Sequence, residues 1–170
     1  WETIEMIVTA LMLYFLIDSV IGRVQVQKIS MIPTLQPGEV LLVNKLAYTF
    51  GEIENGDIIT FHYPLEPELD YVKRVIGKPG DEVLIENKNV WVNGNILFEP
   101  YISAAPEYNG NWQVPMDGLF VLGDNRNPSA DSHIWGFVPL ENVIGKVFAV
   151  YWPPNKIRII STPIIFSQNK

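Results

Sequence analysis

The sequence predicts a mainly β fold, with folded antiparallel sheets or a barrel-like body preceded by one N-terminal transmembrane helix. Two observations carry this prediction. The chain opens on a strongly apolar segment, WETIEMIVTALMLYFLIDSVIG. After that segment come short runs rich in Val, Ile, Phe, Tyr and Trp, separated by Gly, Pro, Asn and Asp, and no long amphipathic helix is indicated.

The opening segment is interpreted as a membrane anchor over residues 1–22. The run from Met6 to Ile17 carries no charge, and Glu5 and Asp18 bracket it. A spanning helix needs roughly 20 mostly apolar residues, which is reached if both carboxylates extend toward the head groups. Because the chain opens on Trp1, we expect the anchor to be truncated at its start. A cleaved signal peptide would have a basic start and a small-residue cleavage site, both absent here, and a buried core helix is the other alternative.

Residues 23–170 are expected to form one β-rich domain. A hairpin is predicted to turn at residues 87–89, and residues 103–116 are expected to form a long surface loop. The predicted strands are short apolar runs between turn residues, at 39–44, 57–63, 70–77, 81–87, 89–94, 118–123, 143–152 and 156–160.

Composition argues against several classes of function. The net charge is −7 and no basic stripe could neutralise phosphates, so a nucleic-acid partner is not expected. The absence of cysteine excludes disulfides and thiolate metal sites, and the only two histidines are far apart in sequence. We therefore expect neither a metal nor another cofactor.

Ser30 stands out because it interrupts an apolar, turn-rich passage, QKISMIPTLQPGEV. A serine hydroxyl is a poor nucleophile until a base takes its proton. His62 lies in a predicted strand without an orienting group nearby, which favours a structural role. His133 lies in a polar loop and is an alternative base, with Asp124 or Asp131 as its partner, although no nucleophile-elbow pattern accompanies it.

Lys73 is the better candidate for the base. Strand alternation places Tyr71, Lys73 and Val75 on one face, so the lysine lies between an aromatic and a β-branched side chain. Desolvation there would lower the pKa of the amine, and a neutral amine can act as a general base, whereas the guanidinium of Arg74 stays charged. The alternative is an ordinary strand lysine with its head group in water.

Four segments together resemble the type I signal peptidases (leader peptidases), the membrane-anchored Ser/Lys endopeptidases that remove signal peptides. Each segment alone is a weak signal, but they occur in the family's order after an apolar anchor and span almost the whole chain. They are SMIPTL (30–35), GDIITF (56–61), YVKRVIGKPGDEV (71–83) and GDNRNPSADSHIWG (123–136).

The resemblance implies a serine endopeptidase with Ser30 as nucleophile and Lys73 as general base. The backbone N–H of Ser30 is expected to donate to the oxyanion. By the same resemblance Ser129 holds the lysine amine by a hydrogen bond. The acidic residue beside it and a supporting ion-pair network match Asp131, Asp124 and Arg74.

The resemblance also implies substrates and a location. The substrates are preproteins carrying signal peptides, bound as an added strand and cut after small residues in an Ala-x-Ala pattern. The chain is expected to cross the lipid bilayer of the cell membrane once, with residues 23–170 on the extracytoplasmic side, although thylakoid relatives share these motifs. The shallow pockets for the small side chains are expected to be lined by Met31, Leu35, Tyr71 and Val72.

The chain departs from the family pattern at two positions. Lys28 stands where many relatives carry Ser or Gly, and a serine there can supply a second oxyanion donor. His133 stands where relatives usually carry arginine, and it can pair ionically with Asp131 only when protonated. The alternative for His133 is a solvated loop residue whose charge matters little.

Two other functions fit part of the pattern. Self-cleaving SOS repressors share a Ser/Lys dyad and a β-rich body, but they would carry a DNA-binding domain and an internal cleavage loop, and neither is visible. A membrane-anchored β domain that binds peptides without cleaving them is the alternative from a different class.

Overall fold

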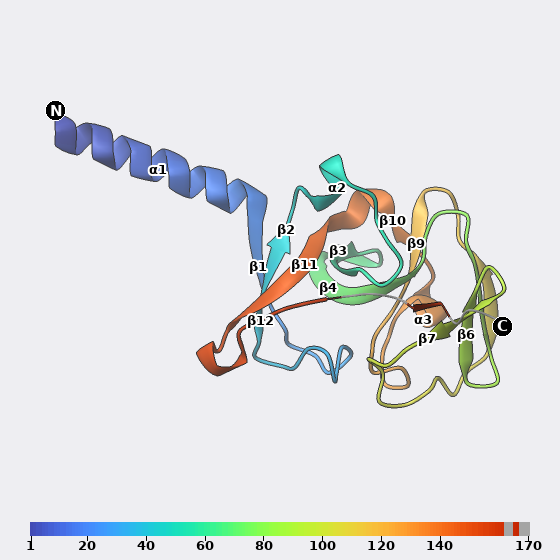
Figure 1. Ribbon diagram of the computed structural model, residues 1–170. Coiled ribbons are helices and arrows are strands. Elements are labelled where there is room, and N and C mark those ends of the chain that lie inside the picture. Colours follow the sequence, from blue (N-terminus) through green and yellow to red (C-terminus); the bar gives the residue numbers. More distant parts are fainter. Residues whose placement is uncertain (162–164, 167–170) are drawn as a thin grey trace.

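The computed structural model describes residues 1–161 and 165–166; the remaining positions of the predicted 23–170 domain, 162–164 and 167–170, lie outside the described residues. One long helix, α1 (Glu2–Val20), projects from a body built of two antiparallel sheets (Figure 1). The predicted fold class is therefore confirmed.

The elements of the body are short. The larger sheet contains β1 (Ile21–Gln25), β2 (Val40–Asn44), β3 (Ile58–Tyr63), β4 (Glu66–Gly77), β9 (Gly118–Leu122), β10 (Val138–Pro139), β11 (Val143–Trp152) and β12 (Arg158–Ile159). The smaller sheet contains β5 (Glu82–Glu86), β6 (Asn89–Val92), β7 (Asn95–Phe98), β8 (Gly110–Gln113) and β13 (Ile165–Phe166). The short helices are α2 (Ala47–Phe50), α3 (Ser132–Trp135), η1 (Leu140–Asn142) and η2 (Pro154–Lys156).

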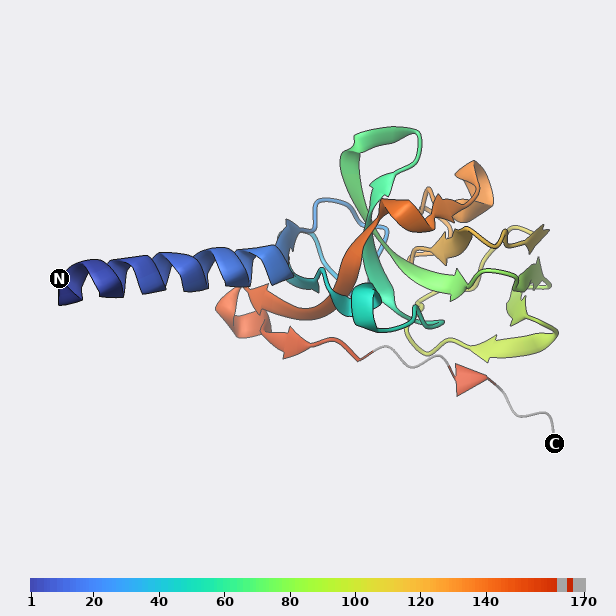
Figure 2. The ribbon, with the colours of Figure 1, turned by 90° about the horizontal axis from the view of Figure 1, so that it is seen from above.

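Helix α1 is long and apolar enough to cross a membrane by length and composition. None of its residues is buried, so the alternative of a core helix packed inside a soluble protein does not fit. The helix ends at Val20, and Ile21 and Gly22, the last two residues of the predicted anchor, pair with β2 as the start of β1. Figure 2 shows the helix leaving the body at one end, with η2 and β12 lying at the same end.

The larger sheet has the order β1-β2-β11-β3-β4-β9-β10, and β12 pairs with β11. All neighbours from β1 to β4 are antiparallel, so β1 and β4 run in the same direction. Only the second part of β4, from Arg74 to Gly77, pairs with β9. Among the described residues, two strand edges are therefore left unpaired: the edge of the first part of β4 that faces away from β3, and the edge of β1 that faces away from β2.

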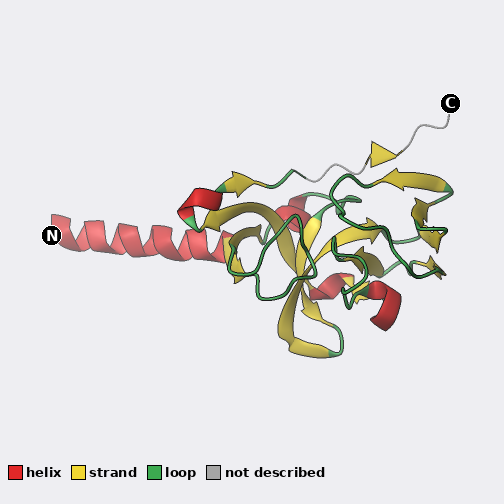
Figure 3. Cartoon of the chain, turned by 90° about the horizontal axis from the view of Figure 1, so that it is seen from below, coloured by secondary structure: helices red, strands yellow, loops and turns green. Residues whose placement is uncertain are grey.

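The smaller sheet has the order β13-β7-β6-β5-β8 and packs against the second part of β4 and against β9. Valines and isoleucines of β5 and β6 meet Ile76, Phe120 and Leu122 in one buried cluster. Figure 3 shows the strands of this sheet at the end of the body away from α1, and the β3–β4 hairpin projecting from the side.

The predicted hairpin at residues 87–89 is confirmed. Asn87 and Lys88 have positive φ angles of 52° and 66°, as a two-residue turn that matches the strand twist requires. Asn89 already pairs with Glu86, so the turn is one residue shorter than predicted.

The predicted loop over residues 103–116 is wrong at Gly110–Gln113, which form β8. This segment is polar apart from Trp112, whose ring packs against Phe120, and its strand form comes from pairing with β5. The predicted strand over 156–160 is reduced to Arg158–Ile159, because η2 extends through Lys156. Strands β1, β7, β10 and β13 were not predicted.

Gly77 marks the junction of the two sheets, and its replacement tests their packing. A Cβ there would lie 2.6 Å from Val83 Cγ2 and 2.9 Å from Val114 Cγ2. We expect Gly77→Ala to lower the free energy of unfolding by about 1–3 kcal/mol through overpacking. Denaturant unfolding of the wild type and the variant measures this, and equal midpoints would contradict the packing described here.

Candidate active site

A groove runs between the two free strand edges, with a volume of about 730 Å³. One wall is β1 with the segment that follows it, up to Met31, and the other is residues 68–73 of β4. Ser30 and Lys73 both line this groove, so the structure brings together the two residues that the sequence singled out. Among the described residues, no group of three or more His, Cys, Asp or Glu side chains could hold a metal ion.

The turn that carries Ser30 is fixed by hydrogen bonds to the loop that follows β9. The backbone N–H of Asn125 donates to the Ser30 carbonyl over 2.9 Å, and the Asn125 side chain donates to the Ile29 carbonyl over 3.1 Å. On the other side of the serine, Met31 and Leu35 are buried in the core of the larger sheet. Ser30 itself stays half-buried at the groove, because its neighbours anchor it from both sides.

Lys73 is only 3% exposed, and its Nζ donates to Ser129 Oγ over 3.1 Å. The pKa of Lys73 is lowered to about 8, mainly by desolvation and to a smaller extent by the nearby charge of Lys28. The charges of Asp131 and Asp124 act in the opposite direction but do not cancel the effect of burial. The amine is therefore neutral in a large fraction of molecules just above neutral pH.

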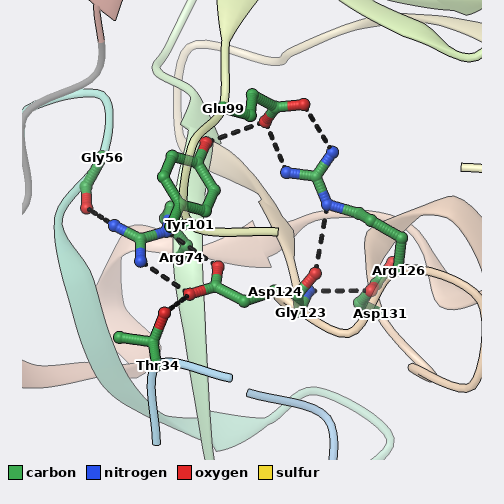
Figure 4. A network of polar contacts seen from close by, with 9 residues as sticks. All are labelled: Thr34, Gly56, Arg74, Glu99, Tyr101, Gly123, Asp124, Arg126 and Asp131. Atoms are coloured by element: carbon green, nitrogen blue, oxygen red, sulfur yellow. Dashed lines mark hydrogen bonds and ion pairs between the residues drawn. The ribbon is translucent and has the colours of Figure 1, made fainter. Parts of the chain in front are cut away.

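Asp124 is occupied by partners other than Lys73. Arg74 donates to both of its carboxylate oxygens, over 2.8 and 2.6 Å, and Thr34 Oγ1 donates over 2.5 Å (Figure 4). Lys73 and Arg74 are consecutive on β4, so their side chains point to opposite faces of the strand. The predicted ion pair of Arg74 with Asp124 is present and binds the turn after Ser30 through Thr34.

Asp131 is also fully occupied. It accepts from the backbone N–H of Gly123 over 2.9 Å and contacts His133 Nδ1 over 2.5 Å. His133 stacks on Tyr108 with ring centroids 3.8 Å apart, and its side chain is only 14% exposed. The alternative of a solvated loop histidine therefore does not fit. Nor is His133 among the residues that line the groove with Ser30, as a Ser/His/Asp arrangement would need.

His62 lies away from the groove lining. Its Nδ1 contacts Asp70 over 2.8 Å, and both side chains are about half exposed. This surface contact agrees with the structural role that the sequence favoured.

The side chains expected to shape substrate pockets fall into two groups. Met31, Tyr71 and Val72 line the groove. Leu35 is fully buried behind it, in the same cluster as Met31 and Val72, and supports the wall from within. Lys28 also lines the groove, where its Nζ donates to Tyr71 Oη over 3.1 Å.

A family model described as signal peptidase, peptidase S26, matches residues 1–152. This chain belongs to that family. Signal peptidase I of Leptolyngbya laminosa is 44% identical over 143 residues, which cover 79% of this chain and 70% of that protein. Signal peptidase I of Bacillus caldolyticus is 43% identical over 139 residues, covering 73% of this chain and 75% of its own length. A crystal structure of a signal peptidase I from Enterococcus faecalis V583 matches with a TM-score of 0.53 and 30% identity, covering 56% of this chain and 97% of that chain.

Within this signal peptidase family member, the sequence did not single out one buried network beside the site. Arg126 binds both carboxylate oxygens of Glu99 with its guanidinium fork and donates to the Gly123 carbonyl over 3.2 Å (Figure 4). Tyr101 donates to Glu99 over 2.7 Å and lies against the Arg74 guanidinium, 3.8 Å from its ring centroid. The network joins the end of the smaller sheet to the loop that carries Ser129.

Gly123 is the residue where the two halves of the site come closest. A Cβ at this position would collide with Ser129 Oγ and with the carbonyl oxygen of Ser30. Both contacts belong to the groups that fix the serine and the lysine, so the close approach requires glycine here.

We therefore expect Gly123→Ala to push the Ser30 backbone and the Ser129 side chain apart. Turnover should fall on the order of 100-fold, since small misplacements of reacting groups have large effects on rate. Gly94→Ala is the comparison for a general loss of stability, because Gly94 has a φ of 75°, which strains an alanine, and lies in the distant smaller-sheet turn, where a Cβ meets nothing within 4 Å. A Gly123→Ala variant with wild-type turnover in a preprotein cleavage assay would contradict this assignment.

Proposed function

We propose that this chain is a membrane-bound serine endopeptidase that removes signal peptides from preproteins, with Ser30 as nucleophile and Lys73 as general base. One observation carries the proposal: a buried lysine amine with a pKa of about 8 lies in the same groove as Ser30. Membership of the signal peptidase family supports the same reaction.

The geometry supports a two-step acyl transfer. Neutral Lys73 takes the proton of Ser30 Oγ as that oxygen attacks the substrate carbonyl, and the resulting ammonium then protonates the leaving amine. Water hydrolyses the acyl-enzyme in the second step, with Lys73 again as the base. In the described structure the amine donates to Ser129, which holds it beside the groove that Ser30 also lines.

Developing negative charge on the substrate carbonyl oxygen needs donors that are already in place. The backbone N–H of Ser30 is assigned as one donor. The Lys28 ammonium is bonded to Tyr71 at the groove wall, where its positive charge favours the oxyanion without a direct hydrogen bond.

The two free edges explain how a peptide is bound. An extended substrate that enters between β1 and β4 can pair its backbone with both strands, because they run in the same direction. Alternate side chains of that peptide then face the same wall, formed by Met31, Tyr71 and Val72. We infer that this wall selects small side chains at two positions separated by one residue, which is the Ala-x-Ala pattern.

The position of α1 supports a membrane location for the groove. Strand β1 begins directly after the helix ends at Val20, so the groove starts beside the membrane if α1 spans it. A preprotein held in the same bilayer by its apolar signal segment would leave the membrane alongside β1 and reach Ser30. From the membership of the signal peptidase family, we propose that the body lies on the extracytoplasmic face of the cell membrane.

Three variants test the dyad. Ser30→Ala and Lys73→Ala are each expected to abolish preprotein cleavage with little change in the melting temperature. Lys73→Arg should be nearly as inactive, because a guanidinium does not deprotonate to act as a base. The assay is cleavage of a preprotein by the detergent-solubilised full chain. Near-normal turnover of Lys73→Arg would contradict the dyad, and peptide binding without any cleavage by the wild type would support the binding-domain alternative.

The pKa of Lys73 predicts the pH dependence of the reaction. Below pH 8 the neutral fraction of the amine, and with it kcat/KM, should rise about tenfold per pH unit and then level off above about 8. A pH–rate profile of the wild type measures this midpoint. A midpoint near ~6.5, the usual value for histidine, would indicate His133 as the base instead.

A further inference from the structure

A C-terminal arginine reaches back to the segment that carries Ser30. Arg158 lies in β12, which pairs with β11 through Val150 and Ala149, and it follows residue 152, where the family match ends. Its side chain is not part of the groove lining, so it does not contact a substrate bound there.

The guanidinium of Arg158 makes three contacts with the segment after Ser30. Nη1 and Nη2 each donate to one carboxylate oxygen of Glu39, both over 2.8 Å, and Nη2 also donates to the Thr34 carbonyl over 2.7 Å. Glu39 is buried and additionally accepts the backbone N–H of Gln36 over 3.0 Å. The planar fork thus binds a carboxylate and a carbonyl of the same loop at once.

The contacts of Arg158 fix the position of the loop that contains Ser30, which is called the serine loop below. Val26 and Glu39 are joined by the backbone hydrogen bond from Val26 N–H to Glu39 O, over 2.8 Å, so residues 27–38 form a closed loop that contains Ser30. Arg158 holds this loop at its base through Glu39 and again at Thr34.

Thr34 is held from two directions. Its carbonyl accepts from Arg158, and its hydroxyl donates to Asp124, which is paired with the neighbour of Lys73 on β4. A change in the arginine contact would therefore shift the serine loop relative to the strand that carries the lysine.

We propose that Arg158 is a positioning residue that sets the Ser30 loop against Lys73. This inference rests on the proposed function, in which Ser30 is the nucleophile. Arg158 acts through Glu39 and Thr34 and not on the reacting atoms.

The ion pair persists over the pH range in which the enzyme would work. Burial raises the pKa of Glu39, but the hydrogen bonds from Arg158 and the Gln36 N–H, together with the positive charges of Arg158 and Lys156, outweigh burial and hold the pKa below its usual value. The guanidinium remains charged throughout this range. A lysine at the same position could neutralise Glu39, but its single ammonium lacks the planar fork that also reaches the Thr34 carbonyl.

The test compares Arg158→Ala and Arg158→Lys with the control Lys156→Ala in the detergent-solubilised full chain. Lys156 is a matched control because it lies at the same tip, 4.0 Å from Glu39 and 3.4 Å from Gln36, and has no contact with Thr34. A serine-directed phosphonofluoridate titrates the reactive sites, and kcat is expressed per titrated site. A substitution that only reduces the amount of folded protein then leaves kcat per titrated site unchanged.

For Arg158→Ala we expect kcat per site to fall on the order of 10–100-fold, as a misplaced nucleophile does. KM and the pH midpoint should stay near the wild-type values, because the groove walls and the surroundings of Lys73 are retained. Millimolar guanidinium should restore part of the lost kcat. Arg158→Lys should fall between Arg158→Ala and the wild type, and Lys156→Ala should match the wild type.

A wild-type kcat per site in Arg158→Ala would overturn the inference and leave the pair as an ordinary structural contact. A shifted pH midpoint would overturn it too, since the change would then act on Lys73. If Arg158→Ala yields no titratable protein, Arg158→Lys decides by the same kcat criterion. Failure of the wild type to cleave a preprotein would instead contradict the proposed function, and the two failures are thereby distinguished.

Discussion

The burial of one lysine amine is the constraint on which the rest of this structure depends. Lys73 is 3% exposed, and the only side chain that accepts a hydrogen bond from it within the described residues is the neutral hydroxyl of Ser129. A buried ammonium with no carboxylate bound to it is costly, so the neutral amine is favoured and the pKa falls to about 8. A lysine in water would be almost fully protonated at that pH.

This state requires that nearby carboxylates be kept from pairing with the lysine, and the surrounding polar groups do this. Arg74 and Thr34 occupy Asp124, while the Gly123 N–H and His133 occupy Asp131. The same bonds tie the serine turn, β4 and the loop after β9 into one unit. The smaller sheet joins this unit through the buried pair of Glu99 and Arg126. The ionic groups around the site therefore hold its side chains in position in addition to balancing charge. Removing one partner would leave a buried charge unpaired, which is costly.

Much of this arrangement could be predicted from the sequence, for local reasons. Strand β11 was predicted with its observed bounds because its residues are almost all apolar or β-branched and turn residues flank them. The alternation of side chains along β4 predicted that Lys73 and Arg74 point to opposite faces of the strand. Strand β8 was missed because its sequence is polar and its form depends on pairing with β5. The roles of Glu99 and Arg158 depend on contacts with residues far away in the chain, and no local pattern marks such contacts.

The most direct test of lysine neutralisation is an NMR titration of Lys73 in the full chain. The lysines are labelled with ¹³C at the ε-carbon, and the signal that is lost in Lys73→Arg is assigned to Lys73. We predict that this signal titrates with a midpoint near pH 8. A midpoint near ~10.4, the value for a lysine in water, would show that burial does not neutralise the amine and would contradict the account.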